Sequence, residues 1–296
     1  MTLFKTPENR IVQDPRWLQP LSSPPGGKPQ CREPHLNRMA TLLSDVFTTG
    51  KGRNLFVLGK PGTGKTVCIR YLLQELRRHA EQENIPLAAV YVNAGKTRTP
   101  YYTLLKIVQG LGVDVPPSGW QMFRLKHAFE DVTKEKPVVV AIDEVETLLR
   151  KEKEPLVYYL NRQPRTTLIL VSNKIEDAAD LPDSALSTLQ PQHIGLAPYT
   201  PDEAKAILRE RVRNALHPQA LSENLLEIVA ELAAKAEDIR LGFSIIRQAA
   251  HTAEQHGRRT IHPDDVKTAF KSETRLIQLR DILENQSALE RLRRRR

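Results

Sequence analysis

A glycine-rich octapeptide narrows the possible folds of this chain more than any other stretch. It fits the pattern G-x-x-x-x-G-K-[ST] in full and consists of Gly59, Lys60, Pro61, Gly62, Thr63, Gly64, Lys65 and Thr66. An apolar run, residues 54–59, leads into it, and an amphipathic stretch, residues 65–82, follows it. Strand, loop and helix in this order are the context that a phosphate-binding loop requires. We expect the loop to bind a nucleotide; a structural turn is the alternative.

Each residue type in the octapeptide suits phosphate binding. Glycine has no Cβ, so backbone N–H groups can turn toward phosphate oxygens. Lys65 is placed to reach the β- and γ-phosphates, and the Thr66 hydroxyl to bind Mg²⁺. The helix that begins here adds the positive end of its dipole. The expected cofactors are therefore ATP and Mg²⁺.

Four further apolar runs predict strands of one parallel sheet. They cover residues 87–93, 138–143, 167–173 and 192–197. Stretches with helical spacing precede or separate them, over residues 35–47, 101–111, 119–133 and 153–160. Apolar strands that alternate with helices favour an α/β fold whose parallel sheet is covered on both faces.

Beyond residue 199 the pattern becomes all-helical. Thr200 is expected to cap a helix that reaches about Ala215, Ser222 to cap a second, and residues 240–256 and 263–270 to form two more. Four parts result. They are an extended Pro-rich segment (1–33), an α/β nucleotide-binding domain (34–198), a helical lid domain (199–272) and a basic C-terminal helix or tail (273–296).

Polar residues follow two of the buried strands. Asp143 ends the third predicted strand and Glu144 comes next. At the carboxyl edge of the sheet Asp143 can hold Mg²⁺ through water, and Glu144 can accept a proton from the attacking water. Asn173 follows the fourth strand and could orient that water. Helix-start chemistry for the acidic pair and a simple strand-end turn for Asn173 are the alternatives.

Composition excludes some classes of protein. No apolar run approaches the ~20 residues of a membrane helix, and the N-terminus lacks the apolar core of a signal peptide. Cys31 and Cys68 lack metal-ligand spacing, so we expect no structural metal and a reducing, cytoplasmic setting. Of the net charge of +9, residues 271–296 carry +4 and residues 34–270 only +3. The basic ends are either solvated tails or contacts to a polyanion.

Taken in this order, these motifs resemble those of an AAA+ ATPase. Three stretches are similar to the replication-initiator branch, the origin-recognition and cell-division-cycle initiators of archaea and eukaryotes. They are Arg32-Glu33, YVNAGKTRTPYYTLLKIVQGLGVDVPPSG and LAPYTPDEAKAILRERV. The resemblance covers roughly residues 32–270. It implies that Asn173 is the sensor-one residue and Arg240 the sensor-two arginine, which reaches the nucleotide phosphates from the lid.

The resemblance also implies a DNA contact. The stretch 97–119 corresponds to a helical insertion that touches DNA in the relatives, and here it offers Arg98 and Lys106. Tyr101 and Tyr102 belong either to this contact or to the core. The C-terminal run adds candidate phosphate contacts from Arg291, Arg293, Arg294, Arg295 and Arg296. We expect nonspecific backbone binding, nucleoid association and no membrane partner.

Two departures from the family pattern bear on activity. The position where relatives carry an arginine finger aligns best with Ser184, while Arg162 and Arg165 lie in a different loop. The chain also stops too soon for a C-terminal winged-helix domain. We therefore expect an initiator-like protein with slow ATP turnover, whose finger comes from another subunit of a homo- or hetero-oligomer. A transposon target-selection or helicase-loading ATPase, or a nucleotide-gated adaptor with negligible turnover, are the alternatives.

Overall fold

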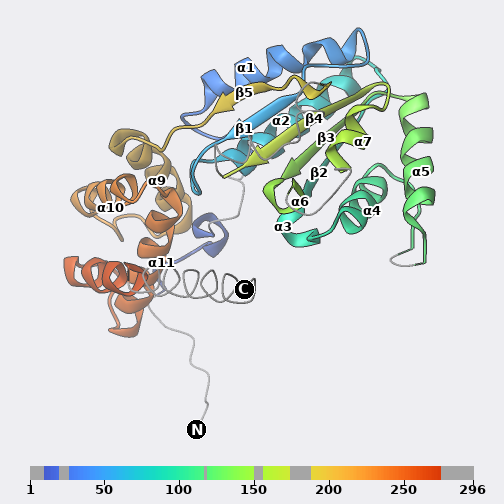
Figure 1. Cartoon of the computed structure of the whole chain (residues 1–296). Coiled ribbons are helices and arrows are strands. Elements are labelled where there is room, and N and C mark those ends of the chain that lie inside the picture. The colour runs from blue at the N-terminus through green and yellow to red at the C-terminus, as the bar shows by residue number, and fades with distance from the viewer. Residues whose placement is uncertain (1–9, 20–26, 117–118, 150–155, 174–187, 275–296) are drawn as a thin grey trace, which may run out of the picture. The chain divides into compact units, whose positions relative to one another are not determined.

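The computed structural model describes residues 10–19, 27–116, 119–149, 156–173 and 188–274 (Figure 1). These form two compact units. One is the continuous stretch Gly27–Pro198, and the other combines Met1–Gly26 with Tyr199–Arg296.

The first unit is built on a parallel sheet that has five strands among the described residues. The strand order is β2-β3-β4-β1-β5, and every pairing is parallel. The strands are β1 (Leu55–Leu58), β2 (Ala88–Asn93), β3 (Val138–Asp143), β4 (Thr166–Ser172) and β5 (Gln192–Gly195). The predicted α/β fold class is confirmed, and each predicted strand agrees with its observed range to within two residues at either end.

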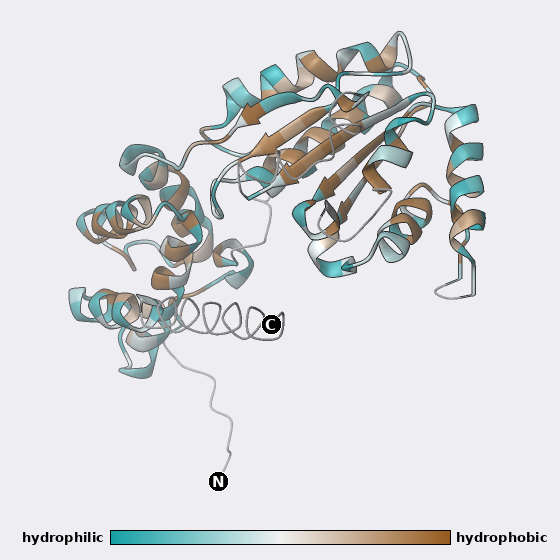
Figure 2. Ribbon diagram, viewed as in Figure 1, coloured by the Kyte–Doolittle hydropathy of each residue, from teal (hydrophilic) through white to brown (hydrophobic). Residues whose placement is uncertain are grey.

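Helices cover both faces of this sheet. Alternate side chains of a strand point to opposite faces. Leu55 and Val57 accordingly pack with α1 (Glu33–Leu43) and α2 (Lys65–Gln82). Phe56 and Leu58 pack with α4 (Pro100–Gly110), α5 (Met122–Glu135) and α7 (Leu156–Asn161). Figure 2 shows β1, β3 and β4 as the apolar, brown centre of this unit, in keeping with their continuous apolar sequences, whereas only Ile194 is buried in the edge strand β5.

Local sequence explains most helix boundaries. Helix α2 spans the predicted residues, and Thr99 caps α4 by accepting the Tyr102 N–H. Helix α5 begins at Met122 rather than at the predicted residue 119, where Gly119 has a φ of +100° that a right-handed helix excludes. Three short helices were not predicted as separate elements: η2 (Ser44–Phe47), α3 (Ala94–Thr97) and α6 (Glu146–Leu149).

The second unit is helical, as predicted. Helix α9 (Pro201–Ala215) begins with a capping box in which Thr200 and Glu203 bond each other's backbone N–H. Ser222 caps α10 (Glu223–Lys235), and α11 (Ile239–Gln255) and a helix over residues 263–274 follow. Within the described ranges, no helix has the length and apolar character needed to cross a membrane.

An N-terminal segment completes this helical unit. Residues 10–19 contain the 3-10 helix η1 (Pro15–Leu18), and Val12 forms an antiparallel bridge with Leu216. Ile11 and Leu18 are fully buried. The buried Arg211 guanidinium lies 5.8 Å from the Trp17 ring centroid and donates to the Trp17 carbonyl. The segment expected to be an extended lead-in thus supplies core residues to the lid.

Candidate nucleotide-binding and catalytic site

The glycine-rich loop joins the end of β1 to the start of α2. Gly62 and Gly64 have φ values of +80° and +88°, in the left-handed region where side chains other than hydrogen are disfavoured. At Gly59 a Cβ would come within 2.5 Å of the Leu196 carbonyl oxygen on the segment after β5. The backbone therefore needs glycine at these positions, as a loop that wraps phosphate groups does.

Lys65, at the first position of α2, is only 6% exposed. Its ammonium group donates to the carbonyl oxygens of Gly59, at 2.6 Å, and of Lys60, at 2.9 Å. The Thr63 hydroxyl donates to the same Lys60 carbonyl at 2.9 Å. The charge of Lys65 is thus held against the backbone carbonyls of the loop itself.

Arg32 supports the loop from behind. Its side chain is buried and donates to the carbonyl oxygens of Thr63, at 3.1 Å, and Ala197, at 2.6 Å. One guanidinium therefore ties the loop to the segment after β5. Sequence reasoning used Arg32 only as part of a resemblance and gave it no role.

Asp143 lies directly beside the loop, at the end of β3. The Thr66 hydroxyl donates to its Oδ2 at 2.6 Å, and the backbone N–H of Glu144 donates to its Oδ1 at 3.0 Å. A hydroxyl and a buried carboxylate in contact at the carboxyl edge of the sheet are the ligand types that Mg²⁺ takes beside a nucleotide. The residues present therefore fit the expected Mg²⁺.

A tyrosine that sequence reasoning missed also contacts Asp143. The Tyr91 hydroxyl, on β2, donates to the same Oδ2 at 2.7 Å. Burial, together with the Asp143 carboxylate, raises the pKa of Tyr91, so the hydroxyl stays protonated at neutral pH. The guanidinium of Arg70, on α2, lies 4.5 Å from the centroid of its ring.

Glu144 occupies a constrained position. Its backbone has a φ of +53°, and its Oε1 accepts a hydrogen bond from the Asn93 side-chain amide at 3.1 Å. A Cβ on Gly95 would collide with the carboxylate of Glu144. Asn93 was missed, although the signal used for Asn173 applies to it as well: a polar residue directly after a buried strand.

Asn173 follows β4, which pairs with the loop strand β1. Its side-chain amide donates to Glu146 Oε1, at the start of α6, at 3.2 Å. Asn173 therefore lies at the same edge of the sheet as Asp143, because β3 and β4 are parallel neighbours.

Arg240 belongs to the lid unit. Its guanidinium makes a two-pronged contact with Asp238, with Nε at 2.8 Å from Oδ1 and Nη2 at 2.5 Å from Oδ2. This contact raises the pKa of Arg240. Asp238 is also the N-cap of α11, so the cap fixes the arginine beside the helix start.

The DNA candidates occupy the stretch between β2 and α5. Arg98 ends α3 with a φ of +60°, and Lys106 on α4 donates to the Gln109 side chain at 3.0 Å. The two tyrosines differ: Tyr101 is half-buried and donates to the Trp120 carbonyl, whereas Tyr102 is 51% exposed. Arg291 and Arg293–Arg296 lie outside the described residues.

The position that aligns best with the family's arginine finger, Ser184, lies outside the described residues. Arg162 follows α7 and stacks on Tyr158, and Arg165 immediately precedes β4. Arg165 therefore lies at the amino end of its strand, the sheet edge opposite the glycine-rich loop.

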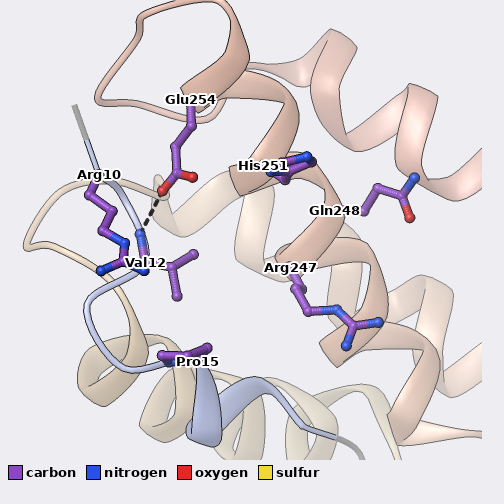
Figure 3. A pocket seen from close by; sticks show the side chains of 7 residues that line it. All are labelled: Arg10, Val12, Pro15, Arg247, Gln248, His251 and Glu254. Carbon is purple, nitrogen blue, oxygen red and sulfur yellow. Dashed lines mark hydrogen bonds between the residues drawn. The ribbon is translucent and has the colours of Figure 1, made fainter. Parts of the chain in front are cut away.

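The lid unit also has a pocket of about 440 Å³ where the N-terminal segment meets α11 (Figure 3). Glu254 accepts the backbone N–H groups of Ile11 and Val12 at 2.6 and 3.0 Å. The pocket is lined by Glu254 and Val12, together with Arg10, Pro15, Arg247, Gln248 and His251. Among the residues described, no group of three or more His, Cys, Asp or Glu side chains could hold a metal ion.

A glycine-rich loop after the inner strand β1, with Thr66 against Asp143, defines a P-loop nucleotide-binding domain. Residues 28–172 match the family model of the AAA ATPase domain, and residues 205–271 match that of the Cdc6 AAA+ ATPase-type lid domain. The chain belongs to the AAA+ ATPases, in the family of the Orc1 and Cdc6 replication initiators.

Similar proteins are known from archaea. An ORC1-type DNA replication protein of Pyrococcus furiosus is 30% identical over 239 residues, which are 76% of this chain and 57% of the relative. The ORC1-type DNA replication protein 1 of Sulfolobus acidocaldarius is 28% identical over 247 residues, 80% of this chain and 62% of the relative. The chain thus spans about three fifths of the length of these relatives.

Solved structures share the fold. The Aeropyrum pernix ORC1 protein in complex with DNA has a TM-score of 0.80 and 24% identity, over 92% of this chain and 71% of that one. Cdc6p from Pyrobaculum aerophilum has a TM-score of 0.71 and 24% identity, over 88% of this chain and 72% of that one.

Proposed function

We propose that this protein binds Mg²⁺-ATP and acts as an initiator-type switch in DNA replication, in which ATP binding and slow hydrolysis change its state. The observation that carries the proposal is the contact between Thr66 and Asp143 beside the P-loop. It brings the two expected Mg²⁺ ligands together next to the lysine expected to bind phosphate. The names of the relatives support a role in DNA replication.

Each candidate site residue has its own proposed role in binding or hydrolysing ATP. Lys65 and the loop N–H groups would hold the β- and γ-phosphates, and Thr66 and Asp143 would hold Mg²⁺. When bound, the metal neutralises charge that develops on the phosphates. Glu144, next to Asp143 in sequence, would accept a proton from water, and Asn173 would orient that water. Arg240 would contact the phosphates when the lid closes.

Two features support slow turnover. The Glu144 carboxylate accepts a hydrogen bond from the Asn93 side-chain amide, which restrains the group that would take a proton from water. The segment that aligns with the family's finger carries no arginine. An arginine finger contributes about 10³–10⁵ in rate where measured. A neighbouring subunit would therefore have to supply it.

We further propose that DNA is bound through its phosphates, in keeping with a nucleoid location. Arg98 and Lys106 in the insertion and the five arginines within residues 291–296 are the candidate contacts. The affinity should then fall with salt, with log K changing by about −0.9 per contacted phosphate on log salt. Removing residues 291–296 should make the slope of log K against log salt shallower by roughly two to four, whatever the DNA sequence.

Two titrations test the proposal. Calorimetry should show ATP binding that needs Mg²⁺ for full affinity. Fluorescence anisotropy of duplex DNA, with ATP or ADP present, should show binding whose affinity depends on which nucleotide is bound. An unchanged salt slope after truncation assigns the contact to the insertion. If neither the full chain nor the truncated chain binds DNA, the DNA role is wrong.

A further inference from the structure

Four side chains from three elements form a closed group around the Asp143 carboxylate. Thr66 and Arg70 lie on α2, Tyr91 on β2 and Asp143 on β3. Thr66 and Tyr91 both donate to Asp143 Oδ2, at 2.6 and 2.7 Å. Arg70 covers the Tyr91 ring at 4.5 Å from its centroid.

The strand register explains how Tyr91 reaches the carboxylate. Tyr91 pairs with Ala141, two residues before Asp143. Residues two apart on a strand share a face, and a diagonal neighbour is within reach of a long aromatic side chain. Ala141 belongs to the hydrophobic cluster against which Tyr91 packs.

The helix spacing places the other two side chains. Thr66 and Arg70 are four residues apart, so they lie on one face of α2. That face meets the end of β3 through Thr66 and the ring of Tyr91 through Arg70. Each member of the group therefore limits the movement of the next.

We propose that Tyr91 is a positioning residue for the metal: its hydroxyl fixes the Asp143 carboxylate in the orientation that binds Mg²⁺, and Arg70 holds the tyrosine ring in place. This inference rests on the proposed binding of Mg²⁺-ATP. The Thr66 hydroxyl donates its hydrogen to Oδ2, which leaves the lone pairs of its oxygen available to the metal.

The size of the effect follows from the number of groups that hold Asp143. Removing a hydrogen-bond partner of a metal ligand typically lowers metal affinity by about 10–100-fold. In Tyr91→Phe the carboxylate keeps the donors Thr66 Oγ1 and the Glu144 N–H. We therefore expect the lower end of that range, about tenfold.

The test measures metal and nucleotide affinity separately in the full chain. A fluorescent N-methylanthraniloyl derivative of ATP is titrated in EDTA, and MnCl₂ binding to the protein–ATP complex is followed by electron paramagnetic resonance. Tyr91→Phe should bind Mn²⁺ about tenfold more weakly and bind the nucleotide in EDTA like wild type. Arg70→Gln should weaken Mn²⁺ binding in the same direction, by roughly two- to threefold.

Tyr159→Phe is a matched control. The Tyr159 hydroxyl also donates to a carboxylate, Glu130 Oε1 at 3.0 Å, and its ring is also covered by a cation, Lys126. It lies on α7, on the other face of the sheet. This variant loses an equivalent hydrogen bond, so it should share any general loss of thermal stability while keeping wild-type Mn²⁺ affinity.

The outcomes separate the two proposals. Wild-type Mn²⁺ affinity in Tyr91→Phe overturns the role of Tyr91 and leaves the proposed function standing. If Tyr91→Phe loses nucleotide affinity in EDTA and Mn²⁺ affinity by the same factor, the role of Tyr91 is also overturned, because that result shows a general defect of the site. If wild type itself binds ATP without any dependence on metal, the proposed Mg²⁺-ATP function fails, and this inference fails with it.

Discussion

The side-chain amide of Asn93 donates a hydrogen bond to the carboxylate of Glu144 at 3.1 Å. The two residues come from neighbouring strand ends, since Asn93 pairs with Asp143 in the β2–β3 register. The group proposed as general base is therefore held by a residue that is not one of the proposed ATP or Mg²⁺ ligands. The direction in which the Glu144 carboxylate points depends on whether this hydrogen bond is made.

Asn93→Ala should release Glu144 and raise kcat for ATP hydrolysis by roughly two- to tenfold, a small part of the ~10²–10⁴ that a general base contributes. Steady-state phosphate release measures it. Asn93 also caps α3 through its Oδ1. Asn93→Asp keeps that acceptor and replaces the donor with a second carboxylate beside Glu144, so it should also release Glu144 and raise kcat. A fall in both variants would show that Asn93 positions the base instead of restraining it.

Glu144→Gln should leave ATP affinity within about twofold and reduce hydrolysis by at least about 10²-fold, because the amide cannot take a proton. Binding is measured by calorimetry and turnover by phosphate release. Equal turnover in wild type and variant would exclude Glu144 as the base.

Lys65→Ala should lower ATP affinity at least tenfold and leave the fold intact, in keeping with charge-assisted contacts of about 1.5–3 kcal/mol. Calorimetric titration with ATP measures the loss. Lys60→Ala is the control: it removes an exposed positive charge from the same loop, so it should have a much smaller effect. An unchanged titration curve for Lys65→Ala would refute the assignment of the phosphate site.

Arg240→Ala should reduce the preference for ATP over ADP, because its guanidinium is proposed to contact the phosphates from the closed lid. Competitive titration of the two nucleotides gives the ratio of affinities. Arg247→Ala removes an exposed arginine two turns further along α11 and should leave the ratio unchanged. An equal loss of affinity for both nucleotides in Arg240→Ala would point to a purely structural role.

Asp265→Asn should lower the free energy of unfolding of the lid at pH 7 by about 1–3 kcal/mol. The buried Asp265 accepts two hydrogen bonds from Arg258, which hold its pKa below the usual value. Because the folded-state pKa is depressed, its contribution is complete above the unfolded-state pKa and is lost as pH falls through the folded-state value.

This pH dependence can be followed in a Trp120→Phe background, where Trp17 becomes the only tryptophan and reports on the lid. Urea denaturation from pH 7 to pH 3 should show wild type losing more stability than Asp265→Asn. Parallel curves would mean that the ion pair adds nothing to acid sensitivity.

Much of the fold follows from local sequence. The bounds of α2 and β3 and the caps at Thr200 and Ser222 were predicted, because each depends on residues within a few positions. The nearness of Thr66 and Asp143 also follows from sequence, since parallel strands end at one edge.

The contacts of Tyr91 and Asn93 could not be predicted in the same way. They depend on the register between β2 and β3, and on which side chains cross from one strand to the next. Periodicity shows which face a residue occupies and leaves the partner on the neighbouring strand undefined. The pairing of Ile11 with Glu254, 243 residues away, has no local signal at all.

That last pairing has a consequence for the order of synthesis. The α/β unit is inserted, in sequence terms, within the lid, so the lid cannot form until the chain has been made beyond Glu254. Synthesis proceeds at about 5–20 residues per second, so roughly ten to fifty seconds pass between the synthesis of Ile11 and Leu18 and the synthesis of the helices that bury them. During translation this N-terminal segment is apolar surface that a chaperone can bind, although in the finished protein it is interior.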